Sequence, residues 1–132
     1  MTESQIEQYA LDILANLGWQ ILHGPDIGPD GAAAERELRQ VVLPERLRSA
    51  LARLNPHIPE PALNEAMRRL TQISKPSLVE NNHEFHQLLV AGVPVQYRMS
   101  SGEVKHDIVR VVDFTSPKNN DFVAVNQLTV LQ

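Results

Sequence analysis

The chain has 132 residues, a hydrophobic share of 42%, a charged share of 21% and a net charge of −4. These values are typical of a soluble globular protein with one core, and the net charge argues against a general nucleic-acid binder. The chain has no cysteine, so disulfide and thiolate chemistry are excluded. No apolar run approaches the ~18 residues of a membrane span, and the acidic N-terminus is no secretory signal, so we expect a cytoplasmic protein without membrane contact.

Charge is unevenly distributed along the chain. The first 35 residues hold six acidic residues and no Lys or Arg, whereas the remainder holds twelve basic and ten acidic residues. An acidic segment on a mildly basic body suits a metal-dependent nuclease, which brings carboxylates to a polyanion. Ordinary solvated surfaces give the same distribution and are the preferred interpretation on charge alone.

The chain begins with a predicted amphipathic helix over residues 3–17. Thr2 and Gln5 fit a capping box, and Gly18 stands where the end of a helix favours a positive φ. Apolar residues recur at three- and four-residue steps, which predicts one buried face. That face consists of Ile6, Tyr9, Ala10, Ile13, Leu14 and Leu17.

A short strand is predicted over residues 19–23, followed by a glycine- and proline-rich segment over residues 24–34. We expect this segment to be an exposed loop. It lacks the Lys-Ser/Thr ending with which a phosphate-binding loop holds phosphate and magnesium.

Three helices are predicted in the middle of the chain. The first has a proline in its first turn, at Pro44, and ends at Asn55. The second opens at Pro59 or Pro61, and the third covers about residues 78–91.

In the last third of the chain the apolar period changes from helical to alternating, which predicts strands. A strand over residues 93–97 turns at Ser101-Gly102 into a return strand over residues 104–114. Asp121 begins a last strand that runs to Gln132 without a turn or a polar tail. Since an open strand edge usually needs a neighbour, we expect a sequence cut from a longer chain. The overall prediction is one α/β domain, with helices first and a mainly antiparallel sheet after.

Two pairs of side chains suggest a metal site. His83 and His86 are three residues apart on a predicted helix, where a zinc protease needs four, and solvated histidines are the preferred interpretation. Asp113 ends an apolar strand and Asp121 begins the next, so the two carboxylates could share a divalent cation. The preferred alternative is that Asp113 hydrogen-bonds the loop at residues 119–120.

Other candidates are acidic and basic residues on helices. Glu3 and Glu7 lie one turn apart on the first helix, and Glu7, at the edge of the apolar face, could point into a cleft. Acidic residues in the opening turns of a helix also interact favourably with the helix dipole, and from the residues alone this surface role is the preferred interpretation. Outward arginines could contact phosphates or a partner domain, or serve solubility. They are Arg46, Arg53, Arg68 and Arg69.

Three motifs, in order along the chain, carry a resemblance to a known family. They are Leu51-x-x-Leu54-Asn55-Pro56 with Pro59 and Ala62-Leu63-x-Glu65-Ala66, then Asn81-Asn82-x-x-Phe85-His86-x-Leu88-Leu89-x-x-Gly92-Val93, then Val112-Asp113-Phe114-x-x-Pro117-x-Asn119-Asn120-Asp121-Phe122-x-x-Val125-Asn126-Gln127. In this order and spacing, the chain resembles the N-terminal endonuclease region of the R (restriction) subunit of type I restriction-modification enzymes. The resemblance covers essentially the whole chain.

The resemblance implies that residues 1–132 are the N-terminal part of a nuclease domain with the PD-(D/E)xK restriction-endonuclease-like fold, truncated at the C-terminus. It implies a parent protein that cleaves unmodified double-stranded DNA with Mg²⁺ and translocates it with an ATP-driven motor further along the chain. It also implies assembly with modification and specificity subunits.

In the family, the metal-binding aspartate and the Glu-x-Lys pair follow the Asn-Gln segment, beyond Gln132. Only the acid of the first helix is matched here, by Glu7 best and by Glu3 second. We therefore expect this chain alone to be unable to cleave DNA. Two alternatives stay open: a non-catalytic DNA-binding or subunit-docking module, and a free-standing small protein that shares the fold.

Overall fold

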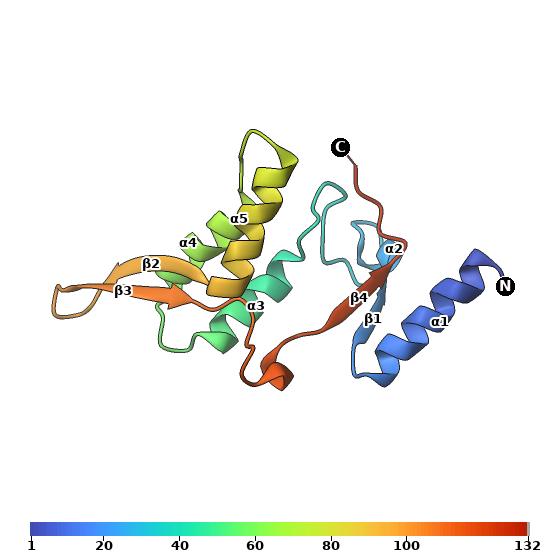
Figure 1. Ribbon diagram of the computed structural model, residues 1–132, viewed down its shortest axis with the longest axis horizontal. Helices are drawn as coiled ribbons and strands as arrows, with labels where there is room; N and C mark the ends of the chain where they lie inside the picture. Colours follow the sequence, from blue (N-terminus) through green and yellow to red (C-terminus); the bar gives the residue numbers. More distant parts are fainter. Residues whose placement is uncertain (132) are drawn as a thin grey trace. The chain divides into compact units, whose positions relative to one another are not determined.

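The computed structural model describes residues 1–131 and shows a mixed α/β protein (Figure 1). The elements in order are α1 (Glu3–Asn16), β1 (Gln20–His23), α2 (Gly24–Ile27), α3 (Pro44–Leu54), α4 (Glu60–Thr71), α5 (Leu78–Ala91), β2 (Val93–Arg98), β3 (Val104–Val109), the 3₁₀ turn η1 (Pro117–Asn119) and β4 (Val123–Asn126). They form two compact units. The strand-pair unit comprises Met1–Pro44 and the segment from Asp121 onward, and the helical unit comprises Glu45–Asn120. The assignment of the whole chain to one nuclease domain stays a prediction.

The predicted capping signals of α1 are confirmed. The Gln5 backbone N–H donates to Thr2 Oγ1 at 3.2 Å, and the Thr2 N–H donates to Gln5 Oε1 at 2.8 Å, which completes the capping box. After the helix, Gly18 adopts a φ of 96°. A backbone conformation of this kind costs a glycine little, so the chain turns sharply from α1 into β1.

The buried face predicted for α1 is wrong. Four of the six residues of that face are between 43% and 72% exposed, and no residue of α1 is buried. They are Ile6, Tyr9, Ile13 and Leu17. The less exposed side carries Glu7, Leu11 and Leu14, of which the prediction included only Leu14. A helix can bury only the side that faces a neighbouring element, and among the described residues α1 packs against β1, one strand of a narrow two-stranded sheet.

The first strand has a partner that the sequence did not reveal. β1 pairs in parallel with β4, in register from Gln20↔Val123 to His23↔Asn126. Within the described residues each sheet has two strands, and only the β2–β3 pair is antiparallel. The prediction of one mainly antiparallel sheet is therefore wrong. An alternation of apolar and polar residues identifies a strand, but it does not identify the strand with which it pairs about a hundred residues away.

The segment after β1 is more ordered than the expected exposed loop. It begins with α2, in which Gly24 and Ile27 are buried, and the Ala33 and Glu35 N–H groups donate to the Asp26 and Ile27 carbonyls at 2.9 Å. Arg36 is only 5% exposed, and its guanidinium donates to backbone carbonyls of Leu38 and Gln40 at 3.0 and 2.7 Å. These hydrogen bonds fold the glycine- and proline-rich segment back on itself.

The helical unit confirms the predicted middle helices. Its core combines α3, α4 and α5 with the inner side of the β2–β3 hairpin, and α4 contacts β2. The buried core residues are Leu51, Ile58, Ala62, Ala66, Leu70, Leu88, Val93, Val95 and Val109. The hairpin turns where predicted, with Gly102 at a φ of 90°.

Two predicted strands are shorter than expected. β3 ends at Val109 rather than near residue 114, because the backbone N–H and C=O of Arg110 bond to the Asn55 side chain instead of a strand. β4 starts at Val123, after Asp121, and ends at Asn126, since Gln127 adopts a φ of 52°. Within residues 1–131, no helix is both long and apolar enough to cross a membrane.

Candidate functional site

Polar side chains lie at the carboxyl ends of the two parallel strands. β1 and β4 lie side by side (Figure 1) and end opposite one another at His23 and Asn126. Their side chains touch, with His23 Nδ1 at 2.9 Å from Asn126 Oδ1. The carboxyl ends of parallel strands are a common place for ligand sites in α/β proteins.

Helix α1 brings one carboxylate to the same end. The chain reverses at Gly18, and the second turn of α1 brings Glu7 within hydrogen-bonding distance of Gln127, the residue after β4. Glu7, which is half-buried, accepts hydrogen bonds from Gln127 Nε2 at 3.0 Å to Oε1 and 3.2 Å to Oε2. Two side-chain pairs therefore lie near the ends of these strands: His23 with Asn126, and Glu7 with Gln127.

The backbone of Gln127 has an uncommon conformation and lies in close contact with Gly24. Gln127 is the only residue other than glycine with a positive φ in the described part of the chain. Its carbonyl packs against the start of α2, because a Cβ built on Gly24 would lie 2.2 Å from Gln127 O. A residue held in an uncommon conformation by its surroundings is a recurring feature of functional sites.

These residues supply one ligand for a divalent cation and not a complete site. A carboxylate is the ligand type that Mg²⁺ prefers, and the Gln127 amide leaves the charge of Glu7 unneutralised. However, residues 1–131 contain no group of three or more His, Cys, Asp or Glu side chains that could hold a metal ion. Glu3, the second candidate, is exposed at the start of α1 and is not joined to this contact by any hydrogen bond described here.

Asp113 organises a loop, as the preferred interpretation predicted. Its carboxylate accepts hydrogen bonds from Asn119 Nδ2 at 3.0 Å and from the backbone N–H groups of Ser116 and Thr115 at 2.9 and 3.0 Å. The Asn119 bond first, and the two N–H groups with it, lower the pKa of Asp113 below its ordinary value. The Asp113 carboxylate is thus hydrogen-bonded by donors of its own loop. It does not lie at the end of a strand, because β3 ends at Val109.

The histidine pair on α5 does not form a metal centre. His83 and His86 are both exposed and line an open hollow of about 850 Å³. Glu84, between them, lies 3.1 Å from Lys75 Nζ. Because no third ligand joins them within the described residues, solvated histidines remain the better description.

Arg53, Arg68 and Arg69 hydrogen-bond to groups of the helical unit. Arg53 donates to Asn119 O at 3.1 and 3.2 Å, and Arg69 donates to Pro94 O at 3.0 Å. Arg68 pairs with Glu65, and this hydrogen bond lowers the pKa of the carboxyl and raises that of the guanidinium. Both side chains are exposed, so the pair contributes little to stability. These arginines mainly connect elements of the unit.

A polar cluster on the hairpin was not predicted. Tyr97 Oη donates to Asp107 Oδ2 at 3.0 Å, and His57 Nε2 lies 3.5 Å from the same oxygen. The Ile108 backbone N–H is the main cause of a lowered pKa at Asp107. The Asp107 carboxylate, surrounded by donors, thus joins β2 to β3.

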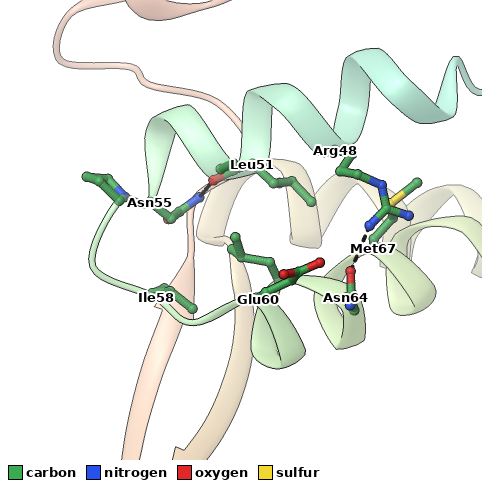
Figure 2. A pocket seen from close by; sticks show the side chains of 10 residues that line it. Arg48, Leu51, Asn55, Ile58, Glu60, Asn64 and Met67 are labelled. Carbon is green, nitrogen blue, oxygen red and sulfur yellow. Dashed lines mark hydrogen bonds between the residues drawn. The ribbon is translucent and has the colours of Figure 1, made fainter.

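The helical unit also holds a pocket of about 380 Å³ between α3 and α4 (Figure 2). Leu51 and Ile58, both buried, contribute to its apolar lining, and Arg48 Nη1 donates to Asn64 Oδ1 at 2.8 Å on its border. Arg48 and Glu60 are its charged lining residues. The pocket therefore suits an apolar group better than a hydrolytic reaction.

The sequence predicted Glu7 as a site residue but not its partner Gln127. Asn126 and Gln127 belong to the third motif, and His23 is not among the predicted site residues. The available signal was a polar pair directly after an apolar strand, at residues 123–127. The missing information was the parallel register, which places that pair beside β1.

Comparison with known proteins identifies the family. The family model described as "Type I restriction enzyme R protein N terminus" matches residues 1–132. The chain is 41% identical over 131 residues to the type I restriction enzyme HindI endonuclease subunit of Haemophilus influenzae, which covers 98% of this chain and 12% of that protein. It is 29% identical over 126 residues to the putative type I restriction enzyme MjaIXP endonuclease subunit of Methanocaldococcus jannaschii, covering 95% of this chain and 12% of that protein.

The chain thus spans about one eighth of the length of these relatives. No solved structure matches it. This family match covers the whole chain and names the same family as the three sequence motifs. The chain belongs to the family of N-terminal regions of type I restriction enzyme R proteins.

Proposed function

We propose that this chain is the N-terminal part of the nuclease domain of an R subunit, and that Glu7 is an active-site acid of that domain. The observation that carries the proposal is the placement of the Glu7 carboxylate at the carboxyl ends of two parallel strands, beside Gln127. The names of both relatives, endonuclease subunits of type I restriction enzymes, support it.

The fold is proposed to be of the PD-(D/E)xK type. A first helix followed by a strand, and a parallel strand pair flanked by that helix, are compatible with such a domain. Two-stranded parallel sheets are rare, because parallel strands normally lie inside larger covered sheets. Further strands from the same domain would complete the β1–β4 pair.

The chemistry in this proposal is Mg²⁺-dependent cleavage of double-stranded DNA. When bound, Mg²⁺ polarises the phosphodiester and helps to form the attacking hydroxide. Glu7 would be one of its ligands. The family resemblance assigns the other ligands, an aspartate and a Glu-x-Lys pair, to positions after Gln127. Residues 1–132 alone are therefore expected to leave DNA intact.

The same proposal names the partners of the complete enzyme. They are double-stranded DNA, the modification and specificity subunits, and ATP bound by motor domains of the R subunit. We place this assembly in the cytoplasm, where the absence of cysteine is unremarkable.

The test is plasmid cleavage by the assembled enzyme with an R subunit that carries this N-terminal sequence, in Mg²⁺ and ATP. Glu7→Ala is expected to lower the cleavage rate at least about 100-fold, as expected when a metal ligand worth several kcal/mol is lost, and to leave ATP hydrolysis unchanged. Glu3→Ala, one turn earlier on α1, is the matched control and should cleave normally. Normal cleavage by the Glu7 variant would exclude the proposed role of this acid.

A second candidate function is a non-catalytic DNA-binding or subunit-docking module. It is favoured by the helical unit, which holds ten Lys and Arg against eight Asp and Glu, and by the apolar pocket between α3 and α4. DNA affinity measured against salt separates the two forms of this alternative. If the module binds DNA through phosphate contacts, the logarithm of its association constant falls with the logarithm of the salt concentration, with a slope of about −0.9 per contact. A module that only docks another protein shows no such DNA affinity.

A further inference from the structure

The hydrogen bond between Gln127 and Glu7 joins two elements that lie at opposite ends of the described chain. Gln127 directly follows β4, and Glu7 lies in the second turn of α1. One amide nitrogen, Gln127 Nε2, is within 3.2 Å of both carboxylate oxygens. We propose that Gln127 is a positioning residue whose side-chain amide fixes the orientation of the Glu7 carboxylate. This inference rests on the role proposed above for Glu7.

A glutamate on a helix needs such a partner if its carboxylate is to hold one orientation. Its side chain has three rotatable bonds and would otherwise sample several rotamers, and this freedom is lost when a ligand is bound. The Gln127 amide is a neutral donor, so it orients the carboxylate and preserves its negative charge for a cation. A lysine or arginine at the same place would neutralise that charge.

The backbone of residue 127 is fixed independently of its side chain. Its φ of 52° is uncommon for a residue other than glycine, and its carbonyl lies in close contact with the bare Cα of Gly24. The contact also requires β4 to be paired with β1, since only that register brings residue 127 to the end of β1. Gln127 itself is exposed, so the site it shapes stays open to a large substrate.

The variant that tests this inference is Gln127→Asn. Asparagine keeps the amide and adopts positive φ more readily than most residues, but its side chain is one methylene shorter and does not reach Glu7. The fold is therefore expected to keep its melting temperature while the contact is lost. Gln96→Asn, which makes the same change at an exposed position of β2, is the matched control.

Two readouts are needed. In the 132-residue protein, the side-chain amide resonances of Gln127 should shift in Glu7→Ala by nuclear magnetic resonance, whereas those of Gln96 should not. In the assembled enzyme, Gln127→Asn is expected to raise the Mg²⁺ concentration for half-maximal DNA cleavage about tenfold, with ATP hydrolysis unchanged. High Mg²⁺ should restore part of the cleavage rate, which a merely structural role would not produce.

The outcomes separate the inference from the proposed function. If Glu7→Ala is inactive and Gln127→Asn has the Mg²⁺ dependence of the parent, Glu7 keeps its role and the positioning role of Gln127 is excluded. A lower melting temperature of Gln127→Asn with unchanged Mg²⁺ dependence also excludes it, because the contact would then be structural. If Glu7→Ala cleaves normally, both the role of Glu7 and the inference fail.

Discussion

Asn55 shows how much one buried side chain determines in this protein. It is 1% exposed, and its Nδ2 donates to the carbonyls of Leu51 and Arg110 at 2.8 and 2.9 Å, while its Oδ1 accepts from the Arg110 N–H at 2.7 Å. The side chain thus closes the last turn of α3 and mimics a strand partner for the residue after β3. It determines where two elements end.

Replacement of Asn55 by alanine should destabilise the helical unit by about 3 kcal/mol, because the N–H and C=O of Arg110 lose their partner inside the protein. Urea unfolding followed by circular dichroism measures this change. Asn64→Ala, at an exposed position with one hydrogen bond to Arg48, is the control and should cost about 0.5 kcal/mol. Equal midpoints for the two variants would contradict the structural role given to Asn55.

At the scale of elements, the junction of β1, α2 and β4 depends on the absence of one side chain. Gly24 starts α2, and the backbone of residues 126–127 passes directly over its Cα. Any Cβ at this position would meet main-chain atoms, which cannot rotate away as a side chain can. The glycine therefore allows the end of β4, and with it Gln127, to approach the start of α2.

The Gly24→Ala variant is accordingly expected to lose about 2 kcal/mol of stability through overpacking. Gly28→Ala is a control in the same segment, because a Cβ there would meet its nearest atoms at an ordinary 3.6 Å. That control should be neutral or slightly stabilising, since alanine reduces the freedom of the unfolded chain. Thermal unfolding of both proteins compares them, and a Gly24 variant as stable as the control would contradict the close contact.

Most of the elements could be predicted from the sequence, and their partners could not. Caps and prolines indicated where α1, α3 and α4 begin, because those signals act within a few residues. The side of α1 that is buried and the parallel pairing of β1 depend on segments far away in the chain. The same holds for the candidate site. Glu7 was proposed from its place on the first helix and from the family resemblance, whereas its contact with Gln127 spans 120 residues and could not be predicted.

At the scale of the whole molecule, the two units differ in net charge. The strand-pair unit holds eight acidic and two basic residues, and the helical unit eight acidic and ten basic ones. An acidic unit is repelled by DNA unless cations or a basic partner compensate, which is compatible with the Mg²⁺-dependent cleavage proposed above. The positive charge needed for DNA affinity is therefore expected mainly outside the strand-pair unit.

The connectivity of the units also sets an order of events during protein synthesis. The helical unit is one continuous segment, whereas β1 must wait for β4, its partner from Gln20↔Val123 onward. Closing so long a loop is slow relative to local folding. Pulse-labelled hydrogen exchange during refolding should therefore protect amides of α4 and β2 before those of Ile21 and Leu22, and the reverse order would contradict this sequence of events. Of the two units, the one that carries Glu7 is the first to be translated and the last to be completed.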